Sequence, residues 1–299
     1  MGKKAMSHMK RSIGEIIFDS ANVIFMVIFM FLMLYPMLYI FLAAFSDPVR
    51  LESHTGFLIA PLGFSISTFR SVLTTRFIQI GFRNTLFYVA SGTTINMFLT
   101  CLGAYVLSRR KYLLKKTFTF LFVFTMFFSG GLIPFYLVVR QLGLLNTPWA
   151  VILPPAISTY NLIIMRTAFV AVPTSMEESA YMDGANDLTI LFRIIIPLCM
   201  PVVAVLILFY SVFHWNAWVN ASIFLQRRDL YPLQLFLREL LITNNTDAMT
   251  TSAGAGDRES ISQSVKYATI VVATVPILFV YPFLQRYFSK GVMIGALKE

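Results

Sequence analysis

The chain has 299 residues, of which 57% are apolar and only 13% charged, and its mean hydropathy is +0.73. Soluble domains average about 45–50% apolar and about 25% charged residues, so this composition excludes an ordinary water-soluble protein. The net charge of +10 does not indicate nucleic-acid binding, because the basic residues cluster at the ends of apolar segments.

Six segments are long and apolar enough to cross a membrane, which takes ~20 residues in a helix. None of them contains Asp or Glu. The sequence therefore predicts an all-α integral membrane protein with one transmembrane domain over 1–299 and six transmembrane helices, at 22–45, 84–107, 117–139, 149–171, 198–219 and 267–285.

The basic residues predict the orientation of these spans. Lys and Arg are concentrated before the first span, after the last, and in the short loop 108–116. Short loops rich in Lys and Arg stay in the cytoplasm. We expect both termini in the cytoplasm and the long loops 46–83 and 220–266 outside.

Local signals within this frame predict further features. Residues 67–80 are expected to form an interfacial helix leading into the second span. Pro232 precedes apolar residues at helical spacing, which predicts a short helix over 231–241. The pair Gly130-Gly131, followed by Pro134, interrupts the third span.

The cytoplasmic loop between the fourth and fifth spans carries the strongest local signals. Thr174 and Glu177 have the spacing of a capping box, so a helix should begin after Pro173. Gly184 should end or bend it, because glycine tolerates positive φ. Asn186 or Asp187 can cap a second helix running to Ile196, which Pro197 should break. We expect two short helices over 174–196 that meet at Gly184.

The composition of this loop suggests a surface for a basic partner. Ser179, Ala180 and Ala185 are small and would allow close approach of a second protein. The acids should form a patch, made of Glu177, Glu178, Asp183 and Asp187. An ordinary solvated loop explains the local pattern equally well.

The loop also resembles the Glu-Ala-Ala motif of the permease subunits of bacterial ABC importers. Glu178-Ser179-Ala180 is followed at the family spacing by Gly184, Ile194 and Pro197, with Ser179 and Ile196 replacing the family's Ala and Leu. Three further segments are similar to the carbohydrate branch, which includes the smaller membrane subunit of the maltose importer: 214–218, 231–234 and 285–291. Residues 232–234 and the tail 290–297 most resemble its Gram-positive subgroup for oligosaccharides and polysaccharide fragments.

The resemblance implies a type I ABC importer permease fold in the bacterial cytoplasmic membrane. It implies a second homologous permease, a cytoplasmic ABC ATPase dimer, an extracellular solute-binding (lipo)protein and an oligosaccharide substrate. The chain has no phosphate-binding Gly-rich loop, so ATP and Mg would bind the ATPase, and this chain would be a transport subunit with no catalytic residue or cofactor. The implied ATPase-coupling residues are Glu177, Glu178, Ser179, Ala180, Asp183, Gly184, Ala185, Ile194 and Pro197.

Polar residues within the spans are candidates for the substrate path, namely Asn161, His214, Trp215 and Asn216. Hydrogen bonding between helices explains such residues as well. Cys101 and Cys199 should pack in the core, and no spacing typical of a metal site occurs.

Three other functions are alternatives to a carbohydrate importer. A permease of the same type for another solute is disfavoured only by the carbohydrate-like segments. An ion-coupled secondary transporter usually needs carboxylates within the membrane, which the spans lack. An intramembrane enzyme is disfavoured because the three His are scattered and no catalytic motif occurs.

Overall fold

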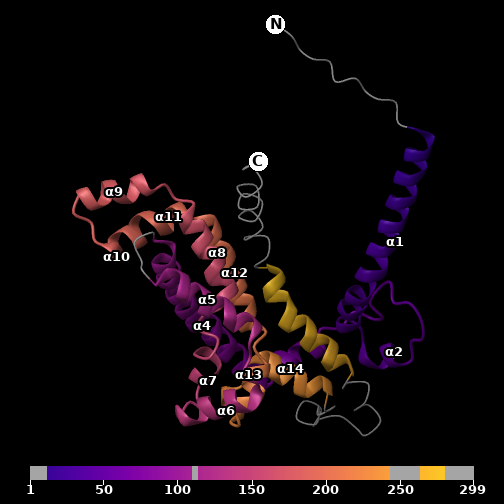
Figure 1. The fold of residues 1–299 in the computed structure, drawn as a ribbon. Coiled ribbons are helices and arrows are strands. Elements are labelled where there is room, and N and C mark those ends of the chain that lie inside the picture. The colour runs from indigo at the N-terminus through magenta and orange to yellow at the C-terminus, as the bar shows by residue number, and fades with distance from the viewer. Residues whose placement is uncertain (1–11, 110–113, 243–262, 280–299) are drawn as a thin grey trace. The chain divides into compact units, whose positions relative to one another are not determined.

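The computed structural model describes residues 12–109, 114–242 and 263–279, and this part of the chain is helical with no β-strand (Figure 1). The chain divides into two compact units, one of residues 1–69 with 252–271 and the other of residues 70–251 with 272–299. Both termini, and most of the basic residues behind the predicted orientation, lie outside the described residues.

The first unit is built on α1 (Ile13–Ala44), which contains nearly all of the predicted first span. The chain then turns through α2 (Pro48–Glu52), whose N-cap Asp47 accepts a hydrogen bond from the Arg50 amide at 3.2 Å. The following loop folds back on α1, since the Tyr35 hydroxyl accepts from the Leu58 amide at 2.9 Å.

The second unit is organised around α4 (Arg76–Ser108), a helix long and apolar enough to be the predicted second span, which begins eight residues earlier than predicted. The predicted helix over 67–80 is divided at Thr75 into α3 (Ser67–Thr74) and the start of α4. α8 (Thr159–Val170) and α12 (Met200–Trp215) pack against α4 and share one apolar core with it. Cys101 and Cys199 are buried in that core as free thiols, which confirms their predicted packing role.

The third predicted span is interrupted at Gly130-Gly131, as the sequence predicted. α5 (Lys115–Phe127) and α6 (Leu132–Gln141) are bent by 118° relative to each other. Gly131 at the break has φ of +88°, a left-handed conformation that glycine adopts without strain.

The fourth predicted span, 149–171, does not form one continuous helix. It contains α7 (Trp149–Ile152), an irregular stretch and then α8. Pro154-Pro155 lies in the irregular stretch, and proline removes a backbone donor and clashes with the preceding helical turn.

The helix of the fifth span is shorter than predicted, and the end of the predicted sixth span, 280–285, lies outside the described residues. α12 ends at Trp215, before α13 (Val219–Phe224), and the helix over Gln263–Phe279 covers the described part of the sixth. Within the described residues two helices are long and apolar enough to cross a membrane, or up to four if each bent pair counts as one span.

Two short elements, α14 and the η2 turn, contact α4 at the end of the second unit that lies away from the 174–198 loop. α14 (Leu233–Ile242) confirms the predicted short helix, and it packs closely on Gly81, where an added Cβ would lie 2.9 Å from the Phe236 ring. Asn84 Nδ2 donates to the Asp229 and Tyr231 carbonyls at 2.7 and 3.0 Å, which fixes the η2 turn (Arg228–Leu230) beside α4.

Candidate functional site

Two short helices form the loop between α8 and α12, as predicted, and they meet at Gly184. α9 (Thr174–Met182) ends in a left-handed residue, since Gly184 has φ of +80°. The Gly184 amide donates to the Tyr181 carbonyl at 3.0 Å, and the Ala185 amide donates to the Ala180 carbonyl at 2.9 Å. This pair of bonds is the Schellman pattern, so the bend is closed by the backbone itself.

The second helix begins where the sequence predicted. Asn186 caps α10 (Asp187–Ile190) by accepting from the Thr189 amide at 2.8 Å. The helix continues as a π-helical turn, η1 (Leu191–Ile195), and as α11 (Ile196–Leu198).

Pro197 does not break this helix, contrary to expectation. It lies in α11 directly after the π-helical turn, and the helix continues to Leu198. The chain instead turns by 90° at Cys199, between Leu198 and Met200.

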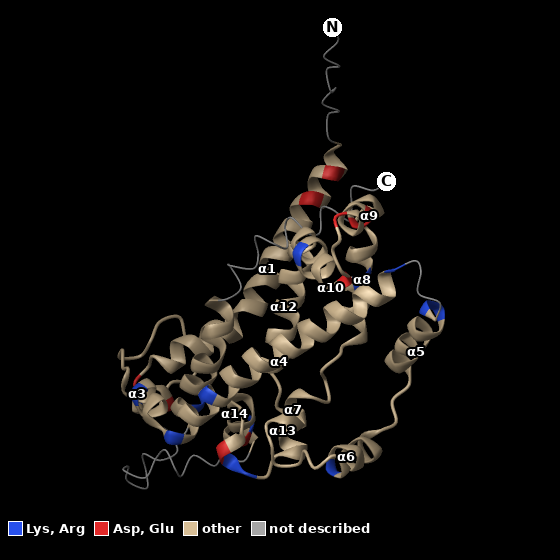
Figure 2. Cartoon of the chain, turned by 90° about the vertical axis from the view of Figure 1, so that its left-hand side faces the viewer, with Lys and Arg blue, Asp and Glu red and all other residues tan. Residues whose placement is uncertain are grey.

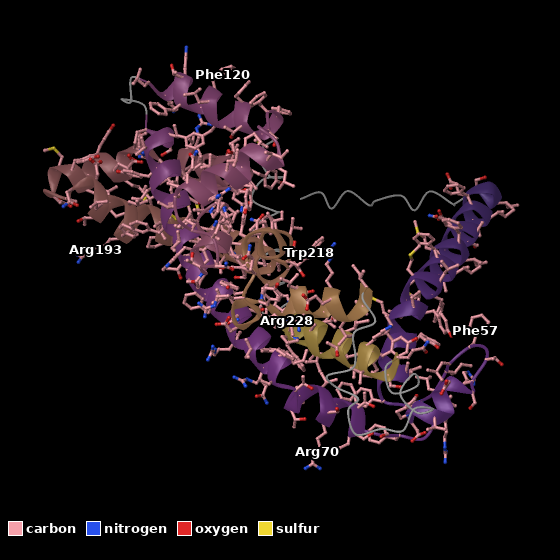
Figure 3. The ribbon with its side chains drawn as sticks, turned by 90° about the horizontal axis from the view of Figure 1, so that it is seen from below. Phe57, Arg70, Phe120, Arg193, Trp218 and Arg228 are labelled. Carbon is pink, nitrogen blue, oxygen red and sulfur yellow. The ribbon has the colours of Figure 1, made fainter. Side chains whose placement is uncertain are left out.

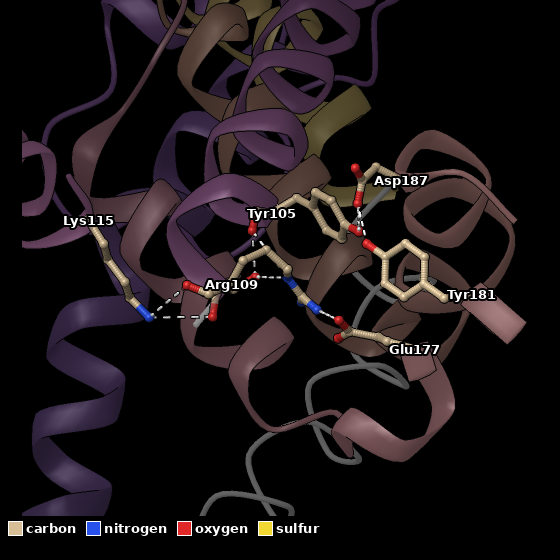
Figure 4. A network of polar contacts seen from close by, with 7 residues as sticks. Tyr105, Arg109, Lys115, Glu177, Tyr181 and Asp187 are labelled. Atoms are coloured by element: carbon tan, nitrogen blue, oxygen red, sulfur yellow. Dashed lines mark hydrogen bonds and ion pairs between the residues drawn. The ribbon is translucent and has the colours of Figure 1, made fainter. Parts of the chain in front are cut away.

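The predicted capping box is absent. α9 starts at Thr174, but no side chain caps it. Glu177 is buried and forms an ion pair with Arg109 at the end of α4 (Figure 4). Its carboxylate is therefore held by a residue 68 positions away in the sequence, and not by its own helix start.

A second contact joins the other side of the bend to α4. Asp187 Oδ1 accepts a hydrogen bond from the Tyr105 hydroxyl at 3.1 Å and a short one from the Tyr181 hydroxyl. This hydrogen bond to Asp187 raises the pKa of Tyr181 above its ordinary value. Tyr105 and Arg109, one helical turn apart, thus hold both short helices (Figure 4).

The predicted acidic patch is consequently divided. Glu177 and Asp187 contact their own chain, whereas Glu178 and Asp183 remain exposed beside Ser179. Met182 is 88% exposed. The outward face of α9 therefore combines two carboxylates with an exposed methionine.

Other predicted coupling residues face inward. Ala180 is buried in the core with Ile190 and Leu191, so its small size serves internal packing. Ala185 and Ile194 are half-buried against the same core, and Pro197 is exposed.

The predicted substrate-path residues are mostly interior. His214 is fully buried, with Nε2 2.7 Å from Asn96 Oδ1, and Trp215 is buried with Nε1 donating to the Ala273 carbonyl at 3.2 Å. Asn161 is buried in the first turn of α8. These three side chains are covered by their own chain, whereas Asn216 is exposed, and a role for any of the four in the substrate path stays a prediction.

The residues that hold the loop were not found from the sequence. Arg109 and Tyr105 had been considered only as part of a basic loop and of a span, and no local pattern links them to 177 or 187. The described residues contain no group of three or more His, Cys, Asp or Glu that could hold a metal ion.

A helical bundle with apolar spans and a protruding, internally braced helical hairpin defines a membrane transport subunit. A family model described as the binding-protein-dependent transport system inner membrane component matches residues 100–294. The chain belongs to this family, whose members are transport subunits of the cytoplasmic membrane that work with a solute-binding protein.

Similar proteins agree with this assignment. The chain is 43% identical over 242 residues to the polygalacturonan/rhamnogalacturonan transport system permease protein YtcP of Bacillus subtilis, covering 81% of this chain and 85% of the relative. It is 37% identical to protein LplC of the same organism, over 94% and 95% of the two chains. A chain from the crystal structure of a bacterial ABC transporter that imports the acidic polysaccharide alginate is 31% identical, with a TM-score of 0.86 and coverage of 94% and 99%.

Proposed function

We propose that this chain is the permease subunit of an ATP-driven oligosaccharide importer. It would form a single domain of six spans with both termini in the cytoplasm. It would supply half of the translocation path and pair with a second homologous permease for the rest. An external solute-binding (lipo)protein would deliver the substrate.

The observation that carries the proposal is the outward face of α9 beside the Gly184 bend. Glu178 and Asp183 are exposed there and suit a basic groove, and Met182 offers an apolar contact. Ser179 leaves room for close approach. We infer that this face docks on one subunit of a cytoplasmic ATPase dimer, which binds ATP and Mg and drives the change of access.

The substrate that we propose is an acidic oligosaccharide. Polygalacturonan and alginate, named for two of the similar proteins, are both polymers that carry carboxylates. The chain is similar to each of these proteins over more than four-fifths of its length. We therefore infer that the substrate of this chain also carries carboxylates.

The charges of the second unit support the same choice. Basic residues lie at α6 and beside α14, at the end of the second unit opposite α9 (Figure 2). Four exposed arginines form no salt bridge within the described residues: Arg70, Arg76, Arg83 and Arg140. The Arg70 side chain projects away from the ribbon (Figure 3).

Two carboxylates in the described part of this end are already paired. Asp229 binds Arg227 at 2.6 Å, and Glu239 binds Arg228 at 3.3 Å. The hydrogen bond from Arg227 lowers the pKa of Asp229, and the charge of Arg83 acts in the same direction. A surface with excess positive charge raises the local concentration of an anionic solute.

Reconstitution tests the proposal. The chain is co-expressed with a candidate second permease and a candidate ATPase, purified, and assayed in proteoliposomes with a candidate binding protein, ATP and either oligogalacturonate or a neutral oligosaccharide. We expect an ATPase and a second permease to copurify, and oligogalacturonate to stimulate ATP hydrolysis.

Other outcomes would redirect the proposal. Stimulation by a neutral sugar alone would overturn the acidic substrate, and stimulation only by a non-sugar solute would favour the alternative permease. Transport without an ATPase would overturn the importer and favour an ion-coupled secondary transporter.

A further inference from the structure

We propose that Arg109 is a positioning residue whose ion pair with Glu177 transmits movement of the coupling loop to α4. The inference rests on the proposed function, because it assumes that α9 receives the force of a partner ATPase. It assigns to the end of α4 a role that neither the family pattern nor the sequence indicates.

The Arg109 side chain is held by contacts with its own helix. Its Nε donates to Ser108 Oγ at 3.0 Å and to the Tyr105 carbonyl at 3.4 Å, and its guanidinium lies 4.5 Å from the centre of the Tyr105 ring. Its Nη1 pairs with the Glu177 carboxylate (Figure 4). The cation is therefore fixed to α4 before it meets α9.

The ion pair is largely shielded from water. The Arg109 and Glu177 side chains are 19% and 10% exposed. Burial lowers the pKa of Arg109 below its ordinary value, but an arginine still remains charged at neutral pH. Because water screens a buried pair little, the pair resists separation more than an exposed pair does.

The bend at Gly184 makes the attachment two-sided. Glu177 lies before the bend and Asp187 after it, and both contact the last turn of α4, through Arg109 and Tyr105 respectively. The Schellman bonds close the bend between them. Force on α9 should therefore move the two short helices and the end of α4 as one body.

α4 can carry that movement into the rest of the second unit. Thr100 Oγ1 lies 2.7 Å from the Tyr210 hydroxyl of α12, and Asn96 lies next to His214 of the same helix. Closely packed interiors transmit displacement because they are not freely compressible. The route is therefore a contiguous set of contacts from the coupling loop to α12.

Charge exchange in the reconstituted complex tests the pair. The variants are Arg109→Gln, Glu177→Gln and the double exchange Arg109→Glu with Glu177→Arg, read out by copurification of the ATPase and by solute transported per ATP hydrolysed. We expect each single variant to assemble but to lower that ratio about 5-fold or more, in the range of known couplings between sites. The double exchange should restore most of the ratio.

A matched control separates the pair from the charge of the loop. Lys116→Gln removes a cation from the same cytoplasmic end, where Lys116 is exposed and has no carboxylate partner within the described part of the chain. It should leave the ratio unchanged. If Arg109→Gln fails to assemble, Tyr105→Phe removes a single hydroxyl and tests the second attachment, with a lower ratio again expected.

Two results are distinguishable. If Glu178→Lys uncouples hydrolysis from transport but Arg109→Gln and Tyr105→Phe do not, the transmission through α4 is wrong and the docking face stands. If Glu178→Lys and Gly184→Val both leave the ratio unchanged, the proposed docking face itself is wrong. An unrestored ratio in the double exchange would also overturn a role for the ion pair.

Discussion

Asn96 and His214 meet in the interior of the second unit, where Asn96 Oδ1 lies 2.7 Å from His214 Nε2. Asn96 Nδ2 also donates to the carbonyls of Pro155 and Ala156, at 2.6 and 3.0 Å. One amide thus joins α4, α12 and the irregular stretch before α8. Backbone carbonyls freed by a break at membrane depth need such partners, because lipid supplies none.

Replacing Asn96 by Leu should destabilise the subunit. The change leaves two backbone carbonyls and the His214 ring without their hydrogen-bond partner, at about 1–3 kcal/mol for each buried group left unsatisfied. The measurement is thermal unfolding of the purified complex in detergent. Asn216→Leu is the control, since Asn216 is exposed and its Nδ2 donates only to the Val212 carbonyl of its own helix. Equal melting temperatures for the two variants would contradict this role of Asn96.

Gly92 allows the close approach of α4 and α12 at the same site. A Cβ at this position would lie 2.4 Å from His214 Nε2. We expect Gly92→Ala to force the two helices apart, at about 1–3 kcal/mol for overpacking a dense core. The unfolding temperature should fall, whereas Gly130→Ala should leave it unchanged, because the space around Gly130 is open. A stable Gly92→Ala variant would mean that His214 can move aside.

Features that depend on nearby residues were predictable from the sequence. The turn at Gly184 needs one residue with positive φ, and the cap at Asn186 needs an acceptor at one position, so both follow from local spacing. α1 and α4 follow from apolar length alone.

Features that depend on distant partners were not predictable. Glu177 has the spacing of a capping box, but in the folded chain its carboxylate pairs with Arg109 and does not cap α9. His214 and Trp215 looked like path residues because polar groups in spans are costly, and their partners Asn96 and Ala273 are known only after the helices have packed. Pro154-Pro155 is a local signal for the break in the fourth span, but the span was predicted from its total apolar length, which does not register a break.

Gly184 should be required for its backbone conformation, and not for space. Nothing lies within 4 Å of a Cβ added there, but its φ of +80° costs an L-residue about 1–2 kcal/mol. We expect Gly184→Val to shift the end of α9 and lower solute transported per ATP, with normal insertion into the membrane. Gly143→Val is the matched control, because Gly143 has a similar φ of +68° in the loop after α6, away from α9. A loss of coupling in both variants would point to general instability.

The exposed arginines should speed capture of an acidic substrate without changing the later steps. Arg76 and Arg83 lie two turns apart on α4, so they project from the same side of the helix. We expect Arg76→Gln with Arg83→Gln to raise the apparent KM for oligogalacturonate and to leave the maximal transport rate unchanged. The wild-type KM should rise with salt, since the Debye length falls from about 10 Å at 0.1 M to about 3 Å at 1 M, and the variant should lose part of that dependence. Docking of the sugar-free binding protein, measured in parallel, is the control. If docking weakens as much as the KM rises, these arginines bind the protein and not the sugar.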